Sequence, residues 1–282
     1  METGLFEAAF GLYAAATALS LAYVFSRNER ITLVMWHLLG FALALHLASF
    51  GFRTALFWRL PEHRRYLPIN TWFGALSFLA FSNALVFWVV EGLARLNILG
   101  AFVLPWTFAA AGAALLFADP APGTLAPDLR SALFNAHPLL LMVAYTAFAN
   151  AFGVSLALLI QERQIRSRRP TEICYRLPAI EDLDRLQGRI IAAAFAVLSC
   201  GVALGVLWTF RLKGKPWGVD AKVLATETTW ILYAAFLAAR RFKGLRGRRA
   251  AQLSIVAFAT LLFTLVVGNS LSQLHAFLSS AK

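Results

Sequence analysis

Residues 188–210 read GRIIAAAFAVLSCGVALGVLWTF, and this stretch decides the fold class of the chain. After Arg189 it contains no charged residue, and Ala, Val and Leu supply most of it. A helix needs about 20 residues to cross a hydrocarbon core that is about 30 Å thick. The stretch lacks the alternation of polar and apolar residues that is typical of a membrane β-barrel strand. It therefore predicts a transmembrane α-helix.

The rest of the chain repeats this pattern. Similar apolar blocks run approximately over 4–26, 31–52, 71–92, 96–117, 138–160, 223–239 and 250–273. The whole chain is 60% hydrophobic and 14% charged, with a mean hydropathy of +0.67, which lies outside the range of soluble globular proteins. We therefore expect an all-α integral membrane protein, a bundle of about eight transmembrane helices. No linker, repeat or composition shift divides it, so residues 1–282 are predicted to form a single polytopic membrane domain.

The positions of Lys and Arg predict the orientation of the bundle. The links at 161–187 and 240–249 are both rich in arginine, and the positive-inside rule assigns them to the cytoplasm. An eight-helix path then places both termini on the outer side of the membrane. Positive-inside anchoring and contact with anionic lipid headgroups account for the net charge of +12. The charge therefore does not call for a nucleic-acid partner.

Two links on the predicted outer side break this rule. The 53–70 link and the 211–222 link both carry several cations. These cations are Arg53, Arg59, Arg64, Arg65, Arg211, Lys213, Lys215 and Lys222. Either the predicted topology is off or the two links face something anionic. The two strongly basic inner links favour the second explanation.

The five histidines are the first candidates for chemistry in the membrane. His37 and His46 are nine residues apart and lie on opposite faces of a helix, whereas His46 and Arg53 share a face. His137 opens the fifth helix and His275 closes the eighth, so both lie at the predicted outer surface. Two neutral imidazoles at one depth could ligate a heme iron from its two sides, although an interfacial histidine is also a common surface group.

The outer link at about 208–222 is rich in tryptophan. Trp208 and Trp217 flank a run of lysines and glycines that ends in Asp220. Tryptophan at a membrane boundary is ordinarily an interfacial anchor. The alternative is a flat aromatic shelf on which a macrocycle could rest. The pattern alone leaves both interpretations open.

The link resembles the tryptophan-rich WWD segment of the CcsA/ResC family of cytochrome c assembly proteins. The family pattern, roughly GxxWxxxxWGxxWxWDPKE, aligns here without gaps as Gly205, Trp208, Gly214, Trp217, Asp220 and Lys222. Further similar elements follow in the same order along the chain. They are His46, the pair His137 and Tyr145, the stretch 177–186, the GRRAA run at 247–251, and 274–277.

The resemblance implies a function and a set of site residues. His137 and His275 would be the axial ligands of a heme iron, and Trp208, Trp217 and Asp220 would belong to the segment that cradles the heme. The heme would be heme b, held non-covalently, because the two cysteines form no CxxCH motif. The chain would present this heme at the outer, periplasmic face of a bacterial inner (plasma) membrane for attachment to an apocytochrome c, acting with a second membrane subunit.

The departures from the family pattern keep other functions open. His46 would be one of two histidines within the membrane, but Ala238 stands where its partner is expected. Lys213 and Val219 replace tryptophans of the segment. One alternative is a heme-bearing or structural membrane subunit of an electron-transfer complex, and another is a HemX-like regulator. Enzymatic activity is left open; if present, it would be that of a component of a cytochrome c heme lyase or synthase.

Overall fold

The apolar blocks form long α-helices in a computed structural model, which describes most of the chain. It describes residues 2–26, 28–60, 67–69, 71–95, 97–119, 121, 132–167, 171, 174–175, 177–213 and 221–271. Within these ranges there are eight α-helices and a short 3-10 helix, η2 (Asn97–Leu99). The helices are α1 (Glu2–Phe25), α2 (Glu29–Phe57), α3 (Trp72–Ala94), α4 (Gly100–Phe117), α5 (Ala132–Arg166), α6 (Ile180–Lys213), α7 (Ala221–Phe242) and α8 (Gly247–Leu271).

The all-α prediction is confirmed for the described residues, all of whose regular structure is helical. Helices α1 to α6 are each long and apolar enough to cross a membrane. Over the residues that the structure describes, helices α7 and α8 fall outside that group, so a total of eight crossings stays a prediction. Several helices extend beyond their apolar blocks. Helix α5 continues to Arg166 and α6 begins at Ile180, so the predicted inner link 161–187 is partly helical.

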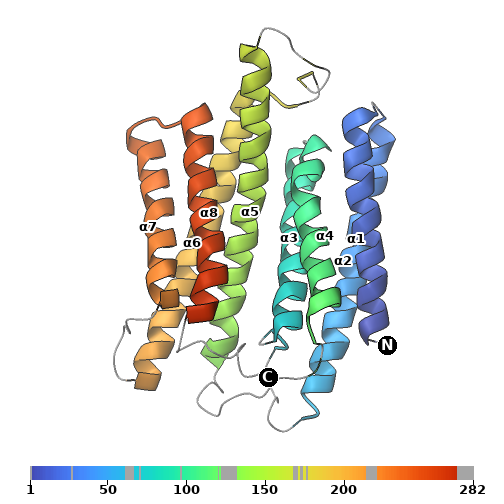
Figure 1. Ribbon diagram of the computed structural model, residues 1–282, viewed down its shortest axis with the longest axis vertical. Coiled ribbons are helices and arrows are strands. Elements are labelled where there is room, and N and C mark those ends of the chain that lie inside the picture. The colour runs from blue at the N-terminus through green and yellow to red at the C-terminus, as the bar shows by residue number, and fades with distance from the viewer. Residues whose placement is uncertain are drawn as a thin grey trace.

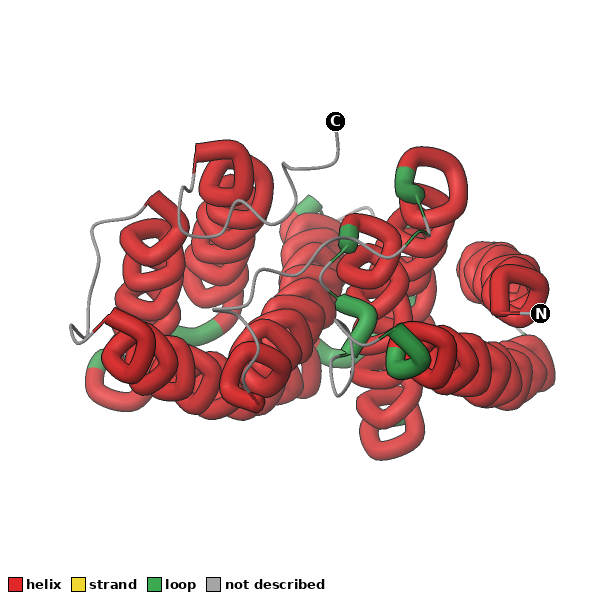
Figure 2. Tube along the Cα trace, turned by 90° about the horizontal axis from the view of Figure 1, so that it is seen from below, coloured by secondary structure: helices red, strands yellow, loops and turns green. Residues whose placement is uncertain are grey.

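The helices form two neighbouring groups (Figures 1 and 2). Helices α1 to α4 pack together in one group and α5 to α8 in the other, and α5 contacts α3 and α4. Consecutive helices run in opposite directions, so the start of α1 and the end of α8 lie at the same end of the bundle (Figure 1). We call this end, where Glu2 begins α1, the Glu2 end. The starts of α3, α5 and α7 lie there too.

Aromatic and small side chains fill the interior. Phe148 on α5 stacks on Tyr233 of α7 with ring centroids 3.6 Å apart, and both residues are fully buried. Nearer the surface, the half-buried Trp36 on α2 stacks on the half-buried Trp88 of α3, and each indole Nε1 donates a hydrogen bond to the backbone oxygen of the other residue. Large apolar side chains such as Phe263 point outward instead. Outward apolar side chains suit a lipid-facing surface.

Candidate functional site

His137 lies in the first turns of α5 at the Glu2 end, where α5 packs against α6. Its Nδ1 lies 2.8 Å from the backbone oxygen of Gly201 on α6, and its side chain is half-buried. A carbonyl oxygen only accepts hydrogen bonds, so this contact requires a proton on Nδ1. In a neutral imidazole the lone pair is then on Nε2. The second ring nitrogen of a metal-bound histidine commonly donates to a carbonyl in this way.

Trp208 lies at the same end of α6, seven residues beyond Gly201, and is half-buried. The structure thus brings two of the predicted site residues, His137 and Trp208, to the same end of two packed helices. Three other predicted residues, Trp217, Asp220 and His275, lie outside the described residues.

His46 belongs to the other group of helices and lies inside it. Its Nδ1 is 3.0 Å from the hydroxyl of Tyr13 on α1, and its Nε2 is 2.8 Å from the hydroxyl of Ser77 on α3. Only 1% of the residue is exposed. The rings of Phe6 and Phe81 meet the imidazole edge-on, with centroids 4.9 Å and 5.4 Å away. The site therefore holds a histidine that is fully hydrogen-bonded and enclosed by aromatic rings.

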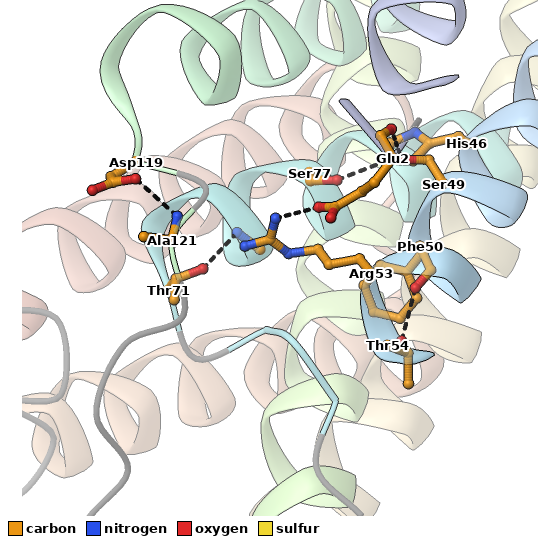
Figure 3. Close-up of polar contacts among 11 residues, drawn as sticks. Glu2, His46, Ser49, Phe50, Arg53, Thr54, Thr71, Ser77, Asp119 and Ala121 are labelled. Atoms are coloured by element: carbon orange, nitrogen blue, oxygen red, sulfur yellow. Dashed lines mark hydrogen bonds and ion pairs between the residues drawn. The ribbon is translucent and has the colours of Figure 1, made fainter. Parts of the chain in front are cut away.

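Arg53 lies two turns beyond His46 on the same face of α2, as the sequence predicts. It forms an ion pair of 2.5 Å with Glu2 at the start of α1, and 3% of the residue is exposed. The guanidinium also lies over the rings of Phe57 and Phe73 (Figure 3 shows the ion pair). The expectation that Arg53 sits in an outer link is wrong, because helix α2 continues through Phe57. Its side chain does face an anion, the protein's own Glu2.

Ala238, where the resemblance predicts a second membrane histidine, lies on α7 and is exposed on the helix surface. Two residues further on, Arg240 makes a bidentate contact with Asp184 of α6, with nitrogen–oxygen distances of 3.0 and 2.7 Å. The backbone N–H of Gly247, which begins α8, donates to the same carboxylate at 2.8 Å. This contact ties three helices together at the end opposite Glu2.

Asp184 precedes the apolar block 188–210. Helix α6 has 34 residues, and this corresponds to about 51 Å at 1.5 Å per residue. Its first turns therefore extend beyond a hydrocarbon core of about 30 Å. Burial acts to raise the pKa of the carboxyl, but the hydrogen bonds from Arg240 and Gly247 and the charges of Arg240 and Arg246 outweigh it. The pKa of Asp184 is therefore lowered.

The two histidine sites differ in how well they fit a heme iron. The hydrogen bond from Nδ1 of His137 to a backbone oxygen is the kind that commonly orients a metal-bound histidine. His46 in its described arrangement does not fit. An iron atom at His46 would have to replace either Tyr13 or Ser77, and Ala238 offers no second ligand.

Several of these contacts were not predicted from the sequence. Tyr13 and Ser77 were not identified as partners of His46, and Glu2 was not identified as the partner of Arg53. A signal for Glu2 exists, since a cation buried in a membrane helix needs an anion and Glu2 is an acidic residue at the start of the neighbouring helix. The sequence gives no comparable signal for the contact between His137 and Gly201 on α6, because glycines are common in membrane helices.

Comparison with known proteins gives one matching family and several relatives. The family described as "Cytochrome C assembly protein" matches residues 69–275. Cytochrome c biogenesis protein CcsA of Synechococcus sp. (strain CC9605) is 28% identical over 237 residues, which cover 75% of this chain and 78% of that protein. Protein HemX of Brevibacillus brevis is 24% identical over 286 residues, which cover 96% of this chain and 97% of that protein.

A solved structure has the same fold. The structure of cytochrome c heme lyase CcmF superimposes with a TM-score of 0.70 at 16% sequence identity. The match covers 94% of this chain and 46% of that chain, so this chain spans less than half the length of that protein. At this identity the likeness establishes the fold alone.

Proposed function

The chain belongs to the cytochrome c assembly protein family, and from this premise we propose that it binds heme and presents it for attachment to an apocytochrome c. The proposed cargo is heme b, held non-covalently at the outer face of a bacterial inner membrane. The proposed partners are a second membrane subunit of a cytochrome c synthase and the c-type cytochrome itself. In this proposal the Glu2 end of the bundle is the outer end.

The observation that carries the proposal is the hydrogen bond between His137 Nδ1 and Gly201 O. It supports ligation through Nε2, because histidines that bind metals are commonly oriented by such a bond. We propose His137 and His275 as the two axial ligands. Trp208, Trp217 and Asp220 are proposed to form the surface on which the macrocycle rests, with the tryptophan rings stacking on it. Trp208 lies at the same end of α6 as the Gly201 carbonyl, which supports this assignment.

A second candidate function has specific support from the membrane histidine. A heme carrier that moves its cargo across the membrane would need an inner site, but His46 is fully hydrogen-bonded and Ala238 cannot ligate iron. A resident heme in an electron-transfer complex needs no such route. We therefore retain a heme-bearing subunit of an electron-transfer complex as the second candidate. A role in regulation, as a HemX-like protein, is the remaining alternative.

Absorption spectra test the proposal. The detergent-purified protein and its His137→Ala and His275→Ala variants are compared in the oxidised and reduced states after hemin is added. We expect a low-spin heme band in the parent and its loss, or a change to high spin, in each variant. A parent that binds no hemin would refute both heme functions.

Gene deletion then separates the two heme functions. An assembly component is expected to be required for several c-type cytochromes. A subunit with a resident heme is expected to be required for one electron-transfer activity, while the other c-type cytochromes mature normally.

A further inference from the structure

We propose that Gly205 and the backbone carbonyl of Gly201 are positioning elements that hold the His137 ring with Nε2 as its ligating nitrogen. This inference rests on the proposed function, because it specifies how the proposed iron ligand is held. It concerns two glycines on α6 that lie one helical turn apart and face α5.

Gly205 allows the ring to approach the helix. A Cβ atom at this position would lie 2.6 Å from Cε1, 2.8 Å from Nδ1 and 3.3 Å from Nε2 of His137. Distances below 3.0 Å are too short for carbon atoms that are not bonded to one another. The imidazole therefore lies directly against the backbone of α6, and any side chain at 205 would push it away.

Gly201 supplies the hydrogen-bond acceptor. Its oxygen lies 2.8 Å from Nδ1 of His137. A backbone carbonyl in a helix is a rigid acceptor, which fixes both the tautomer and the orientation of the ring. The same contact makes Nε2 more basic and thus a better donor to a metal. One turn further along α5, Leu141 packs on Gly201, where an added Cβ would lie 2.9 Å from its Cδ2.

These two glycines differ in a way that provides a matched pair of variants. Gly201→Ala keeps the carbonyl acceptor, and its added methyl group contacts the flexible end of Leu141, which can move. The added methyl group of Gly205→Ala instead overlaps the imidazole ring of His137. Alanine has a higher helix propensity than glycine, so neither change weakens α6 intrinsically. Gly11→Ala on α1, where nothing lies within 4 Å, controls for the substitution itself.

The test measures hemin affinity and spin state in the purified full-length variants. For Gly205→Ala we expect a hemin affinity about 10–100-fold weaker than that of the parent, the usual cost of disturbing the groups that orient a metal ligand. We also expect a partly high-spin spectrum that added imidazole returns to low spin. Gly201→Ala, which keeps the carbonyl acceptor, should lose less affinity than Gly205→Ala, and Gly11→Ala should keep the affinity and spectrum of the parent.

The tautomer is measured without heme, so it remains testable even if Gly205→Ala does not fold. Solid-state NMR of the ¹⁵N-histidine-labelled parent, with the His137→Ala variant to assign the signal, should show His137 protonated on Nδ1. Protonation on Nε2 would overturn the inference. So would a Gly205→Ala protein with the parent's affinity and spectrum, while His137→Ala still lost its heme. If His137→Ala also kept the parent's spectrum, the proposed function itself would fail.

Discussion

The side-chain amide of Asn150 on α5 donates to the side-chain oxygen of Asn83 on α3 at 2.9 Å, and this contact joins the two groups of helices. The Asn83 amide in turn donates to the hydroxyl of Thr107 on α4 at 2.9 Å. All three residues are buried between apolar surfaces. Hydrogen bonds between membrane helices contribute on average about 0.6 kcal/mol each, with a maximum of about 1.7.

Asn150→Leu is expected to lower the stability of the protein. It removes a donor and leaves the Asn83 oxygen buried without that partner, so we expect a loss of about 1–2 kcal/mol. Thermal unfolding in detergent measures the loss. In the double-mutant cycle, Asn83→Leu should lower the stability of the Asn150→Leu variant by less than it lowers the stability of the parent. Strictly additive losses would show that the amide contact contributes nothing.

The ion pair between the buried Arg53 and the partly buried Glu2 predicts a larger effect. Glu2→Gln leaves a buried guanidinium without its counter-charge, and removal of one partner of a buried pair typically costs about 3–5 kcal/mol. The double variant Glu2→Gln/Arg53→Met removes both charges and should recover much of this loss. Unfolding in detergent distinguishes the three proteins. Equal stability of Glu2→Gln and the parent would refute the assignment of Glu2 as the anion that compensates Arg53.

The apolar blocks of the sequence predicted all eight helices but not their ends. Hydropathy detects the part of a helix that lies in hydrocarbon, whereas helical hydrogen bonding continues into charged segments. Hydropathy alone therefore places Arg53 in a link, although α2 extends to Phe57. The shared face of His46 and Arg53 was predicted correctly, because it depends only on the helical period.

Partners on other helices could not be predicted in the same way. Which residue of α1 or α3 meets His46 depends on how far each helix is rotated and shifted against α2. A helix that is apolar all round gives no sign of that rotation, since nearly any face can be buried. The same reason applies to His137 and Gly205. The apolar pattern places both at one end of the bundle but does not indicate that the ring rests on that glycine.

His46→Ala tests whether this histidine serves the fold or binds heme. The substitution removes two hydrogen bonds and leaves the hydroxyls of Tyr13 and Ser77 buried without their partner. We expect a loss of about 2–4 kcal/mol in unfolding free energy, from one to two unsatisfied groups and the cavity that remains. The heme spectrum of the folded protein should not change. A changed spin state in His46→Ala would instead identify His46 as an iron ligand.

The carboxyl of Asp184 predicts a dependence of stability on pH. Its pKa is lowered in the folded protein, so between the folded and the unfolded pKa the unfolded chain binds more protons. The stabilisation is therefore complete above the unfolded pKa and is lost as the pH falls through the folded pKa.

Asp184→Asn removes this titration, because the amide does not ionise. Unfolding of the parent and the variant in detergent across the acid range measures the difference, with Glu181→Gln, an exposed neighbour on the same turn, as the control. The stabilities of the parent and Asp184→Asn should converge as the pH falls, whereas a constant difference would show that the contact does not depend on the charge of Asp184.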